Sequence, residues 1–233
     1  MFQNSKVDRQ AKKRRARNLD EKKWWTQGFS SVDTGAKLRI VPFWERGKYR
    51  GDRIQVVIDP GPAFGLGDHP TTIMALEMLE GAMEVLIETS GRPSVLDVGS
   101  GVGVLSIAAV FLGADFTVAL DIDPIAVNIA ERNFRINDVK ASSEKTQGVL
   151  SCLGGIECVS GCFDLVMANL VAPLLLRIRK PLAQNSRNLL VLSGIFESMI
   201  REVEDAYERE GFELLEKRSR GEWGSVLFRR ASE

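Results

Sequence analysis

The chain has 233 residues, of which 44% are hydrophobic and 27% charged, and its formal net charge is zero. This length and composition are typical of a soluble globular protein with one sizeable α/β domain. No apolar run approaches the roughly 18 residues of a membrane span. No apolar signal segment opens the sequence either, so we expect a cytoplasmic protein.

The three cysteines, Cys152, Cys158 and Cys162, cannot all pair with one another. Free thiols in a reducing cytoplasm are therefore the expected state. A zinc site would need more ligands than these thiols and one distant histidine, so we expect no metal.

Charge is distributed unevenly along the chain. Residues 1–23 hold nine basic and three acidic side chains, so the remaining residues carry 22 basic and 28 acidic ones. Such a basic arm could make a weak contact with RNA, or it could be a solvated terminal helix. We divide the chain into a basic arm with a helical lead-in, 1–37, and a main domain, 38–233.

Two short strands are predicted over residues 38–44 and 53–58, with a turn at 48–52 between them. A loop rich in glycine and proline, 59–72 (DPGPAFGLGDHPTT), follows and contains the only histidine of the chain, His69. Apolar residues at helical spacing then predict a helix over 71–86.

From residue 94 the sequence alternates between predicted strands and helices. Strands are predicted over 94–98, 116–120, 163–168 and 189–192, with a further short strand over 148–152, and helices over 104–112, 124–137, 173–183 and 197–210. This alternation predicts an α/β fold with a doubly wound, mostly parallel sheet. A final strand pair, 212–218 and 225–229, predicts one antiparallel strand at or near an edge.

Ligands of such sheets bind beyond the carboxyl ends of the strands. Gly99, Gly101 and Gly103 stand at one such end, where glycine lets the backbone approach a ligand closely. Asp121 ends the next strand, and a carboxylate there can accept hydrogen bonds from both hydroxyls of a ribose. Together these features predict a nucleoside site, and the alternative is a purely structural turn.

The glycine spacing distinguishes between nucleosides. A dinucleotide fingerprint, G-x-G-x-x-G, would need a glycine at Val104 or Ser106, and a P-loop would need a following G-K-[ST]. Neither pattern is present. The observed G-x-G-x-G suits S-adenosylmethionine (SAM), in which a small methionine carboxylate and amine replace a pyrophosphate.

Polar residues near this site each have two interpretations. Asp97 could hydrogen-bond the amides of the glycine loop, or it could cap the end of its strand. Asp123 is more typical of a helix N-cap than of a ligand. Asn169 ends the strand over 163–169 and could orient an incoming amine or the cofactor, or it could form a turn.

The loop over 59–72 has alternatives of its own. His69 could act as a general base, but a histidine just before a proline-initiated helix is more often a helix cap. Phe64 could cover the cofactor, or it could anchor the loop in the core.

The sequence resembles the ribosomal protein L11 methyltransferase (PrmA-like) family, which methylates amino groups on that protein with SAM. The resemblance is carried by 38–44 (LRIVPFW), 59–72 (DPGPAFGLGDHPTT), 95–105 (VLDVGSGVGVL), 121–124 (DIDP), 168–172 (ANLVA), 192–195 (LSGI) and Glu222-Trp223. The second stretch is the most specific, because the glycine motif is shared by all class I methyltransferases. Leu66 stands where the family usually has threonine.

The resemblance implies a Rossmann-like class I methyltransferase fold with a seven-stranded sheet, and it makes 38–233 the methyltransferase domain. It places Phe64 and His69 in a loop that closes over the cofactor, and it implies cofactor contacts at Thr72, Gly99, Asp121 and Asn169. Family members carry an N-terminal substrate-recruiting domain. Fewer than forty residues precede the matched stretches here, so we expect that domain to be absent.

The predicted cofactor-binding residues are Phe64, Thr72, Asp97, Gly99, Gly101, Gly103, Asp121 and Asn169, and the catalytic candidates are Asn169 and His69. We expect a protein N-methyltransferase that acts on a lysine or an N-terminal amine, with a ribosomal protein as its candidate substrate. The alternatives are a SAM-dependent enzyme acting on a small molecule or RNA, and a non-catalytic RNA-binding module of the same fold.

Overall fold

The computed structural model describes residues 29–61, 67–142 and 148–231. Contacts divide the chain into two units, Met1–Ser30 and Ser31–Glu233, and the fold described here is that of the second unit. The basic residues of 1–23, Phe64 and Leu66 lie outside the described residues. Of the predicted arm and helical lead-in, 1–37, only 29–37 is described, and Val32–Thr34 there is a strand.

A seven-stranded sheet in the order β6-β5-β4-β7-β8-β10-β9 forms the centre of this unit. Its strands are β4 (Ser94–Val98), β5 (Phe116–Asp121), β6 (Gly148–Leu153), β7 (Phe163–Asn169), β8 (Ser186–Phe196), β9 (Phe212–Arg220) and β10 (Trp223–Arg230). Strands β6 to β8 in this order pair in parallel, whereas β10 is antiparallel to both β8 and β9. The predicted doubly wound sheet is confirmed, with its antiparallel strand next to one edge. The strand order reverses at β4, and ligands of such sheets bind at this switch point.

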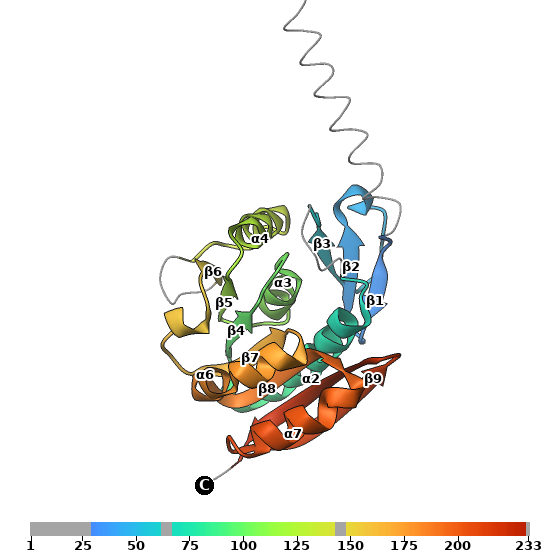
Figure 1. Ribbon diagram of the computed structural model, residues 1–233. Helices are drawn as coiled ribbons and strands as arrows, with labels where there is room; N and C mark the ends of the chain where they lie inside the picture. The colour runs from blue at the N-terminus through green and yellow to red at the C-terminus, as the bar shows by residue number, and fades with distance from the viewer. Residues whose placement is uncertain (1–28, 62–66, 143–147, 232–233) are drawn as a thin grey trace, which may run out of the picture. The chain divides into compact units, whose positions relative to one another are not determined.

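Helices cover both faces of the sheet. They are α2 (Pro70–Ser90), α3 (Val104–Phe111), α4 (Pro124–Ile136), α5 (Ala172–Arg177), α6 (Arg179–Asn185) and α7 (Ile200–Glu208). Figure 1 shows α3 and α4 on one side of the sheet and α6 and α7 on the other. None of the helices in the described ranges has the length and hydropathy that crossing a membrane requires.

The helix predicted over 173–183 is two short helices that meet at Ile178. Pro181 explains the break, because its ring would clash with the carbonyl of Arg177 in a continuous helix and it has no N–H to donate. In the first turn of α6 the missing donor costs nothing, since that N–H would have no partner within the helix.

A second, three-stranded sheet contains β1 (Val32–Thr34), β2 (Leu38–Pro42) and β3 (Ile54–Ile58), in that order. Strands β2 and β3 pair in parallel, with Leu38 opposite Ile54. The segment between them is therefore a crossover that includes a 3₁₀ turn at Phe43–Glu45, and the predicted turn at 48–52 is only part of it. Parallel strands need such a longer return path.

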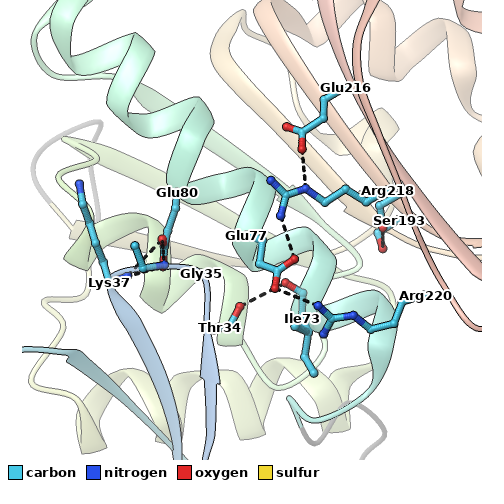
Figure 2. A network of polar contacts seen from close by, with 12 residues as sticks. Thr34, Gly35, Lys37, Ile73, Glu77, Glu80, Ser193, Glu216, Arg218 and Arg220 are labelled. Carbon is cyan, nitrogen blue, oxygen red and sulfur yellow. Dashed lines mark hydrogen bonds and ion pairs between the residues drawn. The ribbon is translucent and has the colours of Figure 1, made fainter.

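Helix α2 is fixed to this small sheet by one buried carboxylate. Glu80 is 6% exposed. It accepts hydrogen bonds from the backbone N–H groups of Ala36, Lys37 and Leu38 at 2.8 to 3.2 Å (Figure 2). The Thr34 hydroxyl adds a bond to the Ile73 carbonyl at 3.2 Å, which is nearer the start of the helix.

The same helix is held to the edge of the main sheet by a second carboxylate. Glu77 accepts hydrogen bonds from Arg218 at 2.8 Å and from Arg220 at 3.1 Å, both on β9, and Glu216 also pairs with Arg218 (Figure 2). Because α2 begins at Pro70, these anchors fix the direction from which residues 69–72 reach the carboxyl ends of the strands.

Candidate functional site

A cavity of about 370 Å³ lies at the carboxyl ends of β4, β7 and β8. It is lined by the start of α2, the glycine loop after β4, the segment after β7, and single residues of β8 and β10. The lining residues are His69, Thr71, Thr72, Gly99, Ser100, Gly101, Val102, Val104, Leu105, Asn169, Leu170, Val171, Leu174, Gly194 and Trp223. Five of the predicted site residues (His69, Thr72, Gly99, Gly101 and Asn169) are brought together here.

The glycine loop is fastened to the neighbouring strand. The N–H groups of Gly99 and Ser100 both donate to the carbonyl of Leu120 at the end of β5, at 2.8 and 3.0 Å. Gly99 has a φ of 75°, and a Cβ there would come within 2.6 Å of the Leu170 side chain. Glycine is therefore required both by the backbone angle and by the close approach.

Gly103 has a structural role at the start of α3, and its predicted contact with the cofactor stays a prediction. It is the N-cap of α3, with a φ of 84°, and it does not line the cavity. A Cβ at Gly103 would lie 2.7 Å from the Phe134 ring and 3.2 Å from Ala130, both on α4. The third glycine of the motif thus allows the loop and α4 to pack closely.

Asp121 supports the glycine loop from β5. Its Oδ2 accepts the Gly101 N–H at 2.8 Å, and its Oδ1 accepts the Asp123 N–H at 2.9 Å. Each carboxylate oxygen has two lone pairs, so each retains one for a further donor. Asp121 is half-buried and lies behind Gly101 rather than among the lining residues of the cavity. Two hydroxyls of a ribose fit this remaining capacity.

Asp97 is fully buried and does not line the cavity. Its Oδ2 accepts the Ser106 hydroxyl of α3 at 2.6 Å, and its Oδ1 has no hydrogen-bond partner among the described residues. The pKa of Asp97 is raised to about 7, chiefly because the carboxyl is buried; the hydrogen bond from Ser106 lowers the pKa, and the nearby Asp121 adds to the rise. In the described contacts Asp97 bonds α3, and not the amides of the glycine loop.

Asn169 and Thr72 meet across the cavity. The Asn169 Nδ2 donates to the Thr72 hydroxyl at 3.4 Å, and Thr72 is buried. This contact leaves the Asn169 Oδ1 as an acceptor. The start of α2 is held in place by the Ser193 hydroxyl of β8, which donates to the Thr71 carbonyl at 2.8 Å.

His69 is the N-cap of α2. Its Nδ1 accepts the Thr71 N–H at 3.4 Å and lies 2.8 Å from the Thr71 hydroxyl. A neutral ring whose Nδ1 accepts a hydrogen bond carries its proton on Nε2, so that nitrogen is a donor. The arrangement thus supports the cap interpretation over that of a general base.

Trp223 and Gly194 are two of the lining residues that received no role in the sequence analysis. Trp223 lies edge-on to His69, with ring centroids 5.1 Å apart, and stacks on Phe196 at 4.2 Å. Gly194 has a φ of 82°, and a Cβ there would lie 2.7 Å from the Leu170 carbonyl oxygen. Both fall in stretches that carry the family resemblance, 192–195 and Glu222-Trp223, which was the available signal.

Comparison with known proteins agrees with this geometry. A family model described as "Ribosomal protein L11 methyltransferase (PrmA)" matches residues 1–231. The chain is 38% identical over 213 residues to the ribosomal protein L11 methyltransferase of Pelobacter propionicus, which covers 89% of this chain. The chain spans 66% of that protein's length, and about two thirds of the other curated relatives.

Solved structures resemble the chain as well. The crystal structure of a ribosomal protein L11 methylase from Lactobacillus delbrueckii subsp. bulgaricus aligns with a TM-score of 0.74 at 30% identity, covering 88% of this chain and 100% of that one. Magnesium protoporphyrin IX methyltransferase from Synechocystis, solved with bound SAM, aligns with a TM-score of 0.53 at 16% identity over 81% of this chain and 89% of its own, and shows a shared fold alone. With its family match, its sheet order and its glycine loop, this chain belongs to the ribosomal protein L11 methyltransferase (PrmA) family.

Proposed function

We propose that this chain is a SAM-dependent methyltransferase that modifies amino groups of a ribosomal protein. One observation carries the proposal most directly. A glycine loop held by Asp121 and an asparagine at the end of β7 line or border one cavity at the switch point of a doubly wound sheet. Membership of the methyltransferase family supports it.

The residues present fit SAM as the cofactor. When bound, SAM supplies a methyl group activated on a sulfonium, so the protein needs no covalent nucleophile. Asp121 accepts hydrogen bonds from the ribose hydroxyls through the capacity left on its two oxygens. Gly99 and Gly101 both have a positive φ, and without a side chain at either position the loop backbone would be free to approach the methionine portion.

The other wall of the cavity orients the incoming amine. Asn169 presents its Oδ1 to an amine N–H while Thr72 holds the carboxamide in place. Trp223 supplies an aromatic surface beside it, which suits an amine that gains methyl groups and positive charge. Transfer is then a matter of orientation, since the amine must lie in line with the bond that breaks.

His69 contributes as a positioning residue in this account. It caps α2 and contacts Trp223, and the protonation state that the cap requires leaves Nε2 as a donor. The amine therefore loses its proton to water or to another acceptor before it reacts.

The substrate is proposed from the relatives. They are named for ribosomal protein L11, and a ribosomal protein with a lysine or N-terminal amine is the class of substrate that we propose here. The same reasoning supports a cytoplasmic location. A weak contact of the basic residues in 1–23 with RNA stays a prediction, because those residues lie outside the described ranges.

The proposal is tested by incubating the full chain with methyl-labelled SAM, purified ribosomal protein L11 and ribosomal RNA. We expect label on amino groups of the protein, mapped by mass spectrometry, and a loss of rate of about 100-fold or more in Asn169→Ala. Asn128→Ala is the matched control, because Asn128 is exposed on α4 and bonds only the Pro124 carbonyl.

Label on RNA alone would replace the protein substrate with a nucleic acid. If neither L11 nor RNA is labelled, the rate is measured on a substrate found in extract. An unchanged rate of Asn169→Ala on that substrate would contradict the role assigned to Asn169.

A further inference from the structure

Helix α4 touches the glycine loop through one buried carboxamide, that of Asn133. This side chain is fully buried. Its Nδ2 donates to the carbonyl of Val102 in the glycine loop at 2.9 Å, and also to the carbonyl of Asp59 at 3.1 Å. Its Oδ1 accepts the Asp59 N–H at 2.9 Å. Both hydrogens of the amide are used, and two carbonyls fix which end of the amide is the nitrogen.

We infer that Asn133 is a positioning residue for the cofactor site, because it sets the conformation of the glycine loop through the Val102 carbonyl. The inference rests on the proposed function, in which that loop receives the methionine portion of SAM.

The loop depends on few other contacts on this side. The N–H groups of Gly99, Ser100 and Gly101 all donate to the end of β5, through the Leu120 carbonyl and the Asp121 carboxylate. Within the loop, the Ser100 carbonyl accepts the Gly103 N–H at 2.8 Å. Val102 is 1% exposed, so its carbonyl must find a partner within the protein. Asn133 is that partner, and it ties the loop to α4.

The packing around this bond is equally close. Gly103 leaves no room for a Cβ against Ala130 and Phe134 of the same helix turn. Arg132 pairs with the Asp59 carboxylate at 2.5 Å, which fixes the end of β3 to α4 a second time. One helix turn is thus the common support of the glycine loop and of the segment that leaves β3.

The chain contains a matched control one helix turn later. Asn137 is 9% exposed and makes the same kind of contact with β3. Its Oδ1 accepts the Val57 N–H at 2.8 Å, and its Nδ2 donates to the Val57 carbonyl at 2.7 Å. Its third bond, however, goes to the Asn133 carbonyl within the helix at 2.8 Å, and not to the glycine loop. Together the two amides cover the edge of β3 that has no neighbouring strand.

The two variants therefore separate stability from positioning. Asn133→Ala and Asn137→Ala each remove a buried amide that satisfies both polar groups of one backbone residue, so we expect similar losses in melting temperature. Only Asn133→Ala frees the Val102 carbonyl. We expect its affinity for S-adenosylhomocysteine to fall about tenfold, as for one lost hydrogen bond of ordinary strength. The affinity of Asn137→Ala should stay within about twofold of the wild type.

The measurement is titration calorimetry with S-adenosylhomocysteine, well below the melting temperature of every variant. Asn133→Ser, which keeps one donor and leaves a smaller void, is measured in parallel and should also bind more weakly than Asn137→Ala. Methyl-transfer kinetics give a second readout, in which the KM for SAM rises in Asn133→Ala while kcat changes less.

Equal affinities in the Asn133 and Asn137 variants would overturn the inference and leave the proposed function standing. Absence of binding by the wild type would overturn the proposed function, and the inference with it.

Discussion

Two carboxylates at the carboxyl ends of neighbouring strands behave differently because their surroundings differ. Asp121 is half-buried, and each of its carboxylate oxygens accepts one backbone N–H group. Asp97 is fully buried, receives one hydroxyl, and has an oxygen with no hydrogen-bond partner in the described part of the chain. Burial therefore favours the neutral form of Asp97, whose pKa is raised from its ordinary 3.8 to about 7.

This difference predicts a pH dependence of stability. Between pH 4 and 7 the unfolded chain has lost the Asp97 proton while the folded chain still holds it. The unfolded state then binds fewer protons, so the contribution of Asp97 to stability falls as the pH rises through this range. Asp97→Asn removes that titration. The variant should gain stability relative to the wild type from pH 5 to pH 8, by as much as roughly 3 kcal/mol.

Urea unfolding of both proteins at pH 5 and pH 8 measures this gain. If the free energies of unfolding of variant and wild type differ by the same amount at both pH values, Asp97 is already ionised in the folded protein at pH 5.

At the scale of elements, α2 connects the cavity with the small sheet and with the edge of the main sheet. Its first residues line the cavity, and its later turns are bound to the small sheet by Glu80 and to β9 by Glu77. Three backbone N–H groups share the Glu80 carboxylate, which is 6% exposed. These hydrogen bonds satisfy backbone N–H groups in and next to the turn between β1 and β2, which strand pairing would otherwise have to satisfy.

We expect Glu80→Ala to lower the free energy of unfolding by roughly 3 kcal/mol, because the buried N–H of Leu38 and two part-buried N–H groups lose this partner. Glu84→Ala is the control on the same helix. Glu84 pairs with Lys37, but its side chain is 56% exposed, so its loss should cost less than about 0.5 kcal/mol. Denaturant unfolding compares the two variants, and equal losses would contradict the role assigned to Glu80.

The strands that end at the site are also those that the sequence predicts best. Strands β4, β5 and β7 are buried apolar runs that stop at a glycine, an aspartate and an asparagine, and their observed bounds lie within one residue of the predicted ones. Strand β8 is longer than predicted, Ser186–Phe196 instead of 189–192. The sequence pattern predicts that the strand ends at its polar residues and before Gly194, but pairing with β7 and β10 extends the strand through these positions.

At the scale of the whole molecule, the features that escaped prediction depend on contacts between distant parts of the chain. The parallel pairing of β2 with β3 requires a crossover that no local pattern reveals. Asn133 lies 74 positions from Asp59 and 31 from Val102, so its double contact follows only from the packing of α4. Trp223 reaches the cavity because β10 lies beside β8, which its own sequence neighbourhood does not indicate.

The predicted site residues accordingly divide in two. Gly99, Gly101 and Asn169 follow strand ends, and topology alone brings them together. His69 and Thr72 join them because of the anchors of α2, and their expected place in the site came from the family resemblance. Phe64 lies outside the described residues, and its predicted role stays a prediction.

The central claim is that SAM binds where Asp121 supports the glycine loop. Calorimetric titration of S-adenosylhomocysteine into the wild type, Asp121→Ala and Asp123→Ser tests it most directly. Asp123→Ser removes an acid two residues away and retains an oxygen that can cap α4. We predict stoichiometric binding by the wild type, affinity at least about tenfold lower in Asp121→Ala, and a change within about twofold in Asp123→Ser. An Asp121→Ala variant that binds as tightly as the wild type would contradict the account.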